Sequence, residues 1–282
     1  MQHRILARSS RFRGRVARLS ATVFVVATAS RASADHCHSP PPDANGREPS
    51  ELGLRVWVSL EAAAYDNAPY EGDYEGAALG ASFQRGPLQA WAVMPSYRLL
   101  RSGQEFLGIG DLLTGARFAV LQDEAQTLAA GFTFVATWPS GDRTRDLGMG
   151  HVMIMPGIWA AWRVTEAFVH GELSYARAIA SSADRSNHQD GPPVPRPLVD
   201  PMNSSEGAAR LAAGYFLVEQ LRARSSIYGA VPIADEHGAA RGIVSAGVDL
   251  VVGSFETGLE GQVPVVGDPF TFKIVLTAAG RF

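Results

Sequence analysis

From Leu54 to its last residue, the chain consists of runs in which apolar and polar side chains alternate, separated by turn residues. In the last run, Phe270, Phe272 and Ile274 share one face, and Lys273 lies on the other. Successive side chains of a β-strand point to opposite faces, so this alternation predicts strands and fits no amphipathic helix. Runs of about ten or more residues are typical of transmembrane β-barrels, whereas strands of soluble sandwiches have about five or six.

Twelve runs of this kind are present, and single-chain bacterial barrels have an even number of strands. Every second connection is short, and those between are longer, up to the Pro/Asn/Asp-rich segment 180–205. Because short periplasmic turns and long external loops are typical of outer-membrane barrels, we predict an all-β, twelve-stranded antiparallel transmembrane β-barrel. A soluble two-sheet sandwich is the alternative. The runs lie near residues 54–64, 73–84, 88–99, 108–121, 127–138, 148–162, 167–179, 206–217, 222–231, 241–252, 255–266 and 270–282.

The first 34 residues have the features of a secretory signal peptide. Six arginines precede an apolar stretch at 19–29, and Ala32-Ser33-Ala34 matches the small-x-small pattern that signal peptidase accepts. As a helix, the stretch is too short to cross ~30 Å of hydrocarbon. We therefore predict a signal peptide (1–34), a Pro-rich periplasmic segment (35–52) that hangs free or fills the lumen, and a β-barrel (53–282).

The chain that follows the signal is acidic, because residues 1–34 hold seven of the 25 basic residues and none of the 28 acidic ones. This balance argues against binding to nucleic acid, whose phosphates require a basic face. Cys37 has no partner for an internal disulfide, and the residues before it lack the small apolar box of lipoproteins. No later window approaches ~18 consecutive apolar residues, which excludes membrane-spanning helices.

The expected location is the bacterial outer membrane, and the expected partners are its lipid, a small-molecule solute and the barrel-assembly machinery. That machinery recognises an apolar C-terminal strand whose last residue is an outward-facing aromatic, and Phe282 is the last residue of such a strand. Aromatic girdles at the membrane interfaces are the second expected feature. The outward aromatic residues are Phe118, Phe132, Phe134, Trp138, Trp162, Tyr175 and Tyr215.

Three parts of the chain carry a family resemblance. They are Met94-Pro-Ser-Tyr-Arg98, then Gly108-Ile-Gly-Asp-Leu112, and then Trp138-Pro-Ser-Gly-Asp142 followed by Leu147-Gly-Met-Gly150. In this order they resemble the bacterial outer-membrane family named for the meta-cleavage pathway of phenol degradation, which usually has Leu-Pro-Thr-Gly where this chain has Trp138-Pro-Ser-Gly141. The resemblance implies a twelve-stranded outer-membrane barrel that acts as a transporter or channel, and it implies no catalytic residues.

If the apolar faces meet lipid, the opposite faces line the lumen. The charges on these faces are of mixed sign, so they could cross-link a rigid, partly filled interior or line a polar pathway for a solute. The tryptophans and tyrosines among them could fill space or stack on a small aromatic solute. The candidate lumen residues are Arg55, Trp57, Glu61, Trp91, Asp111, Arg117, Trp159, His170, Glu172, Arg222, Arg224, Tyr228, Glu256, Glu260 and Lys273.

Two groups of residues suggest metal binding as an alternative function. His151, Met153 and Met155 lie on one side of a strand, with inward His170 expected on the neighbouring strand, and thioethers with imidazole suit Cu(I). His36, Cys37 and His38 at the predicted mature terminus add two imidazoles and a thiol. Both groups also have ordinary explanations, because methionine is a common filler and such tails are often disordered.

An enzymatic function is not expected, and neither is a cofactor. The sequence has no Gly-x-Ser-x-Gly and no His-Glu-x-x-His, and His170 lies on the polar face rather than on the wall where a barrel lipase would need it. The glycines near Asp111 are not a nucleotide-binding motif, since no helix follows them. Gly110 is instead expected to bend a strand, and Asp111 to point inward.

Overall fold

The computed structural model describes residues 53–67, 70–101, 103–123, 127–145, 147–164, 166–181, 202–233, 239–267 and 270–282. Almost all of these residues are in β-strands, and the strands form a single antiparallel sheet. The strands are β1 (Gly53–Asn67), β2 (Tyr70–Arg85), β3 (Leu88–Arg101), β4 (Gln104–Ile109), β5 (Leu112–Gln122), β6 (Leu128–Trp138), β7 (His151–Val164), β8 (Ala167–Ser181), β9 (Ser205–Val218), β10 (Leu221–Pro232), β11 (Arg241–Val252), β12 (Phe255–Val266) and β13 (Phe270–Arg281).

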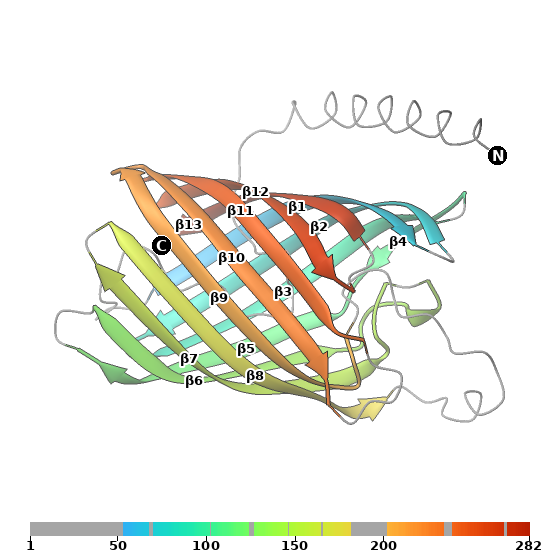
Figure 1. Ribbon diagram of the computed structural model, residues 1–282, viewed down its shortest axis with the longest axis horizontal. Helices are drawn as coiled ribbons and strands as arrows, with labels where there is room; N and C mark the ends of the chain where they lie inside the picture. The colour runs from blue at the N-terminus through green and yellow to red at the C-terminus, as the bar shows by residue number, and fades with distance from the viewer. Residues whose placement is uncertain are drawn as a thin grey trace.

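The sheet closes on itself because the last strand, β13, pairs with β1 (Figure 1). Strands β4 and β5 both pair with β3, β4 along its residues 96–101 and β5 along 88–93. They are therefore two parts of one strand, interrupted at Gly110 and Asp111, and the ring has twelve strand positions. The prediction of a closed twelve-stranded antiparallel barrel is confirmed.

The outer wall is apolar over most of its area. Leucine, isoleucine, valine and phenylalanine point outward from every long strand and are about half exposed, as Leu173 and Phe132 are at 56% and 60%. The seven aromatic residues predicted to face outward are all exposed. Within the described residues, no helix has the length and apolar character needed to cross a bilayer.

Two connections that the sequence analysis took for loops are strand instead. β1 and β2 remain paired out to Asn67 and Tyr70, and β3 and β4 out to Arg101 and Gln104. Alternation of apolar residues stops there, which is why the sequence pattern missed these extensions. Arg98 supports the second one, because its guanidinium bonds Glu105 at 2.9 Å and Glu75 at 3.3 Å.

The orientation of Phe270 also differs from the prediction, which placed it on the outer face. The register between β1 and β13 shifts at Ala64 and Tyr65, so Thr271 is an extra residue that forms a β-bulge. Thr271 bonds the Ala64 carbonyl oxygen at 3.0 Å and points outward, and Phe270 turns inward, where it is 4% exposed. A bulge reverses the facing of the residues beyond it.

On the inner wall, aromatic rings lie over glycines of the neighbouring strand. Trp57 faces Gly80, and Trp91 faces Gly115, as directly paired residues. A Cβ atom on either glycine would collide with the indole ring. Glycine at these positions therefore lets the rings lie flat against the wall instead of projecting into the lumen.

We expect Gly115→Ala to destabilise the barrel by about 1–3 kcal/mol, because the added methyl must displace Trp91 from a packed position. Gly171→Ala is the matched control, since the nearest atom to its Cβ would be Leu211 Cδ1 at 4.0 Å. The measurement is the temperature at which the folded band is lost in unboiled gel samples. Equal transition temperatures for the two variants would contradict this explanation.

Candidate functional site in the barrel lumen

All fifteen candidate lumen residues lie on the inner wall, and most are less than 10% exposed. They do not form one continuous path of charge. Many of them belong to an ion-pair network at the end of the barrel with short turns, to a mixed cluster halfway along β7–β9, or to an apolar cluster towards the opposite end, which we call the mouth; Trp57 and Trp91 belong to a second apolar cluster.

The ion-pair network connects β10, β11, β12, β13 and β1. Arg222 lies 3.2 Å from Asp249 and 3.3 Å from Glu256, and its side chain is 1% exposed. Arg224 pairs with Asp249 at 3.1 Å and also with Glu260. Arg55 and Arg281 each approach Glu256 at 3.4 Å. The network cross-links five neighbouring strands.

Lys273 lies on the inner wall next to aromatic rings. Its ammonium nitrogen is 4.7 Å from the centre of the Phe270 ring and 5.8 Å from that of Tyr74. The β-bulge at Thr271 brings Phe270 to this position. Lys273 therefore belongs with the aromatic residues nearer the mouth.

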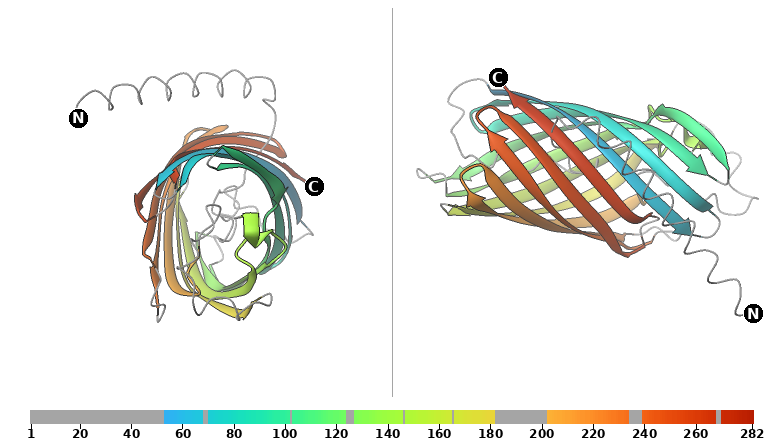
Figure 2. Two further views of the ribbon diagram at one scale, coloured as in Figure 1. Left: turned by 90° about the vertical axis from the view of Figure 1, so that its right-hand side faces the viewer. Right: turned by 90° about the horizontal axis from the view of Figure 1, so that it is seen from above.

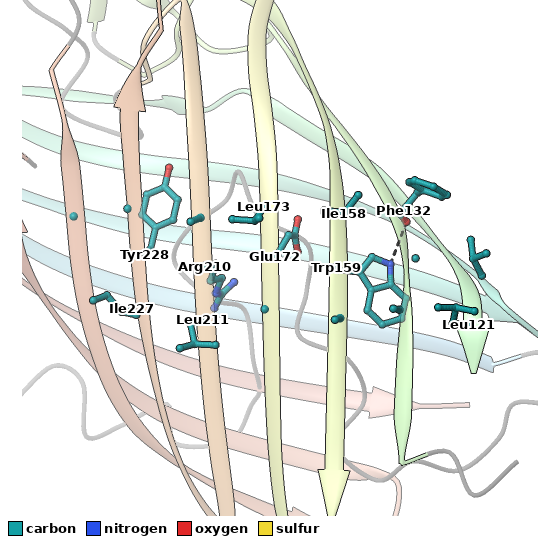
Figure 3. A pocket seen from close by; sticks show the side chains of 18 of the residues that line it. Leu121, Phe132, Ile158, Trp159, Glu172, Leu173, Arg210, Leu211, Ile227 and Tyr228 are labelled. Atoms are coloured by element: carbon teal, nitrogen blue, oxygen red, sulfur yellow. Dashed lines mark hydrogen bonds between the residues drawn. The ribbon is translucent and has the colours of Figure 1, made fainter. Parts of the chain in front are cut away.

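The mixed cluster comprises Arg117, Trp159, His170, Glu172 and Arg210. Arg117 pairs with Glu172 at 3.4 Å and lies 4.9 Å from the centre of the Trp159 ring. Figure 3 shows Trp159, Glu172 and Arg210 on successive strands, with a hydrogen bond of 3.2 Å from Trp159 Nε1 to the Phe132 carbonyl oxygen. This bond fixes the orientation of the indole ring.

An apolar cluster lies on the inner wall towards the mouth. It brings together side chains from β2 and β3 on one wall and from β10, β11 and β13 on another, with Leu147 from the connection between β6 and β7. These groups line the lumen on the mouth side of the barrel. The large members are Tyr74, Tyr97, Leu99, Leu147, Tyr228, Ile243 and Phe270.

The described residues 139–145 and 147–150 connect β6 to β7 at the mouth of the barrel, and we call them the mouth loop. Its 3-10 helix η1 (Arg143–Arg145) lies inside the ring of strands when the barrel is viewed along its axis (Figure 2, left). Leu147, near the end of the loop, is 1% exposed. The sequence analysis gave 139–147 as an external loop and 148–150 as the start of a strand, and it did not predict the attachment of this segment to the wall.

Asp111 holds the mouth loop to the wall. One carboxylate oxygen accepts a hydrogen bond of 2.9 Å from Gly141 N, and the other accepts one of 2.7 Å from Met149 N. A Cβ on Gly148 would collide with the same carboxylate. Asp111 thus bonds both ends of the loop.

The motif segments that carry the family resemblance meet around Asp111. Gly110 N donates to the Pro95 carbonyl oxygen at 2.9 Å. The Ser140 hydroxyl donates to the Gly110 carbonyl oxygen and accepts from Leu112 N, both at 2.8 Å. Segments that are far apart in the sequence therefore form one hydrogen-bonded junction at the gap between β4 and β5.

Asp142 begins the 3-10 helix within the loop. Its carboxylate accepts hydrogen bonds from the hydroxyl and N–H of Thr144 at 2.6 and 2.9 Å and pairs with Arg145 at 3.2 Å. The hydroxyl hydrogen bond, followed by the backbone bond and the arginine charge, holds the pKa of Asp142 below its ordinary value. These contacts all lie inside the loop, so Asp142 shapes the loop without attaching it to the wall.

His170 is not brought to the methionines of the proposed metal site. Met153 and Met155 share a face of β7 as expected, but they pack in an apolar cluster with Leu113 and Val135. His170 is paired with Ala161, six residues from Met155, or about 20 Å along the strand. Within the described parts of the chain, no three His, Cys, Asp or Glu side chains gather as a metal site would require.

His36, Cys37 and His38 lie outside the described residues. The terminal residues therefore remain a prediction from sequence alone.

Comparison with known proteins gives the fold. No model of a known protein family matches the sequence, and no curated protein matches it. Among solved structures, an outer-membrane channel from Pseudomonas putida F1 superposes with a TM-score of 0.64 at 13% identity, over 87% of this chain and 100% of that chain. The KdgM porin gives 0.47 at 6% identity, over 81% and 99%.

The translocator domain of the autotransporter NalP from Neisseria meningitidis also gives 0.47, at 15% identity over 85% of this chain and 90% of that chain. At these identities the likeness to the Pseudomonas protein shows the fold alone. The chain has the fold of an outer-membrane β-barrel.

Proposed function

We propose that this barrel is an outer-membrane channel through which a small solute passes by passive or facilitated diffusion, and that it is not an enzyme. The observation that carries the proposal is the mouth loop. Its 3-10 helix falls within the ring of strands when the barrel is viewed along its axis (Figure 2, left), and a single carboxylate from the wall bonds both ends of the loop. Such a loop narrows a passage, whereas a purely structural barrel gains little from it.

The inner wall supports a small aromatic or hydrophobic solute. Trp57, Trp91 and Trp159 lie on the inner wall, the first two flat over glycines, and the apolar cluster at the mouth would favour a solute that tolerates desolvation. This agrees with the resemblance to the family named for phenol degradation, which stays part of the proposal.

A closed structural barrel is the competing function, and the ion-pair network and the apolar cluster are the observations in its favour. A liposome-swelling experiment distinguishes a channel from a closed barrel. Liposomes that contain the folded protein are placed in an iso-osmotic solution of a small sugar, and their rate of swelling is measured. A channel speeds swelling well above the rate of protein-free liposomes. Equal rates would overturn the channel proposal.

The charge network predicts a change of ion selectivity. Arg222→Ala combined with Arg224→Ala removes two positive charges from the inner wall and leaves Asp249, Glu256 and Glu260 in place. We expect reversal potentials in a salt gradient to shift towards cations, because unbalanced carboxylates attract them. Identical reversal potentials for wild type and variant would show that these residues do not line an open path.

A further inference from the structure

Four of the six methionines of the chain meet in one apolar cluster on the lumen wall. Met153, Met155 and Met202 are less than 5% exposed, and Met149 of the mouth loop packs against the same cluster. The sequence analysis named only the two methionines of β7. Methionine is a flexible filler of protein cores, so a gathering of thioethers does not by itself assign a ligand.

His151 supplies a nitrogen ligand next to these sulfurs. It lies two residues before Met153 on β7, and the extra residue at the register shift there belongs to β8, so both side chains point to the same face, with Cα atoms about 7 Å apart. The imidazole has a hydrogen bond with the backbone of Met149, and within the described part of the chain its buried Nε2 atom has no hydrogen-bond partner. The backbone bond therefore uses Nδ1–H, which leaves the lone pair of Nε2 free to bind a metal.

The hydrogen bonds of the mouth loop hold Met149 beside His151. Met149 N donates to Asp111 at 2.7 Å, and the backbone of Met149 accepts the imidazole N–H. A histidine that binds a metal through one ring nitrogen typically donates its other N–H in this way, which fixes the orientation of the ring. The nitrogen and sulfur ligands are therefore positioned before an ion binds.

The ligand types and the local charge favour a soft monovalent ion. Thioether sulfur and imidazole nitrogen are neutral ligands that suit Cu(I), whereas zinc in proteins is bound by thiolate, imidazole and carboxylate. The positive charge of Arg143 acts on the His151 imidazole. Because Coulomb repulsion is proportional to the charge of the ion, Arg143 disfavours a divalent cation twice as strongly as a monovalent one.

We propose that His151 Nε2 and the thioether sulfurs of Met149 and Met153 bind one Cu(I) ion on the lumen wall, where the mouth loop joins β7. This ligand set keeps His151 and Met153 from the sequence prediction and has Met149 in place of His170. The site goes beyond the proposed channel function and does not depend on it, because binding requires only the folded barrel with its mouth loop docked.

Titration of the full, detergent-solubilised chain with Cu(I) tests the site. The ion is kept reduced under argon, and its binding is measured by competition with the indicator bicinchoninate. His36→Ala, Cys37→Ser and His38→Ala are introduced first, so that the terminal imidazoles and thiol do not bind the ion. We expect one Cu(I) per barrel and binding of Zn²⁺ that is about tenfold or more weaker. A barrel that binds no Cu(I), or that binds Zn²⁺ as tightly, would overturn the proposal.

His151→Leu and Met153→Leu in this background should each weaken Cu(I) binding about tenfold or more. Met94→Leu is the matched control, because Met94 faces outward, is 38% exposed and should keep the affinity of the parent barrel. Leucine is close to methionine in volume, so Met153→Leu removes the sulfur with little change in packing. Gel migration without boiling reports the folding of each variant. Unchanged Cu(I) affinity in either folded site variant would contradict the assignment of its ligand.

Discussion

Asp111→Asn should open the mouth of the barrel. The asparagine keeps one acceptor oxygen but turns an NH2 group towards one of the two backbone N–H donors, Gly141 or Met149. Loss of one charge-assisted hydrogen bond and burial of an unsatisfied donor cost about 2 kcal/mol, which is a factor of about 30 in the ratio of docked to undocked loop. Single-channel recording in planar bilayers should show longer or larger open events than in wild type.

Asp142→Asn is the control for this prediction, because the Asp142 carboxylate bonds only within the loop among the contacts described, to Thr144 and Arg145. It should leave conductance close to the wild-type value. If Asp111→Asn and wild type gave the same conductance, the docked loop would not be what narrows the passage.

Arg222→Ala should cause the largest loss of stability of any single substitution in the lumen wall. Arg222 bridges Asp249 and Glu256, and its removal leaves two carboxylates that are almost fully buried with fewer compensating charges. Breaking a buried pair from one side typically costs about 3–5 kcal/mol. The temperature at which the folded band disappears from unboiled gel samples should fall strongly.

Arg98→Ala is the comparison for Arg222→Ala. Arg98 also pairs with two carboxylates, Glu75 and Glu105, but all three side chains are about half exposed. Exposed pairs of this kind are worth about 0.2–1 kcal/mol, so the transition should hardly move. Similar losses in the two variants would mean that burial does not set the importance of the Arg222 network.

The alternation of apolar and polar side chains is enough to predict the barrel. Successive side chains of a strand point to opposite faces, and each run must place its apolar face towards lipid. The same rule placed Arg117, His170, Glu172 and Arg222 on the inner wall. It could not pair them, because partners such as Arg55 and Glu256 come from distant parts of the chain, and the register that joins them depends on the closed ring.

The failures have local causes. The sequence analysis places Phe270 on the wrong face, because a single bulge at Thr271 reverses the alternation and the residue types there do not reveal the bulge. The docking of the mouth loop was missed because Leu147 resembles an ordinary loop residue and Gly148 the first residue of a strand, and only the structure shows that Asp111 bonds the segment. The signal that could have found it was the grouping of the motif segments, which now form one junction.

The most direct test is to measure which side chains along one strand face lipid when the protein is in a bilayer. Nitroxide labels placed singly along 169–175 of β8, with Cys37 replaced by serine, can be measured in liposomes for collision with oxygen and with a water-soluble nickel complex. The account predicts high oxygen accessibility at Val169, Gly171, Leu173 and Tyr175, and low values at His170, Glu172 and Ser174. Low oxygen accessibility throughout, without a period of two, would contradict it, since the apolar face would then be packed inside a soluble protein.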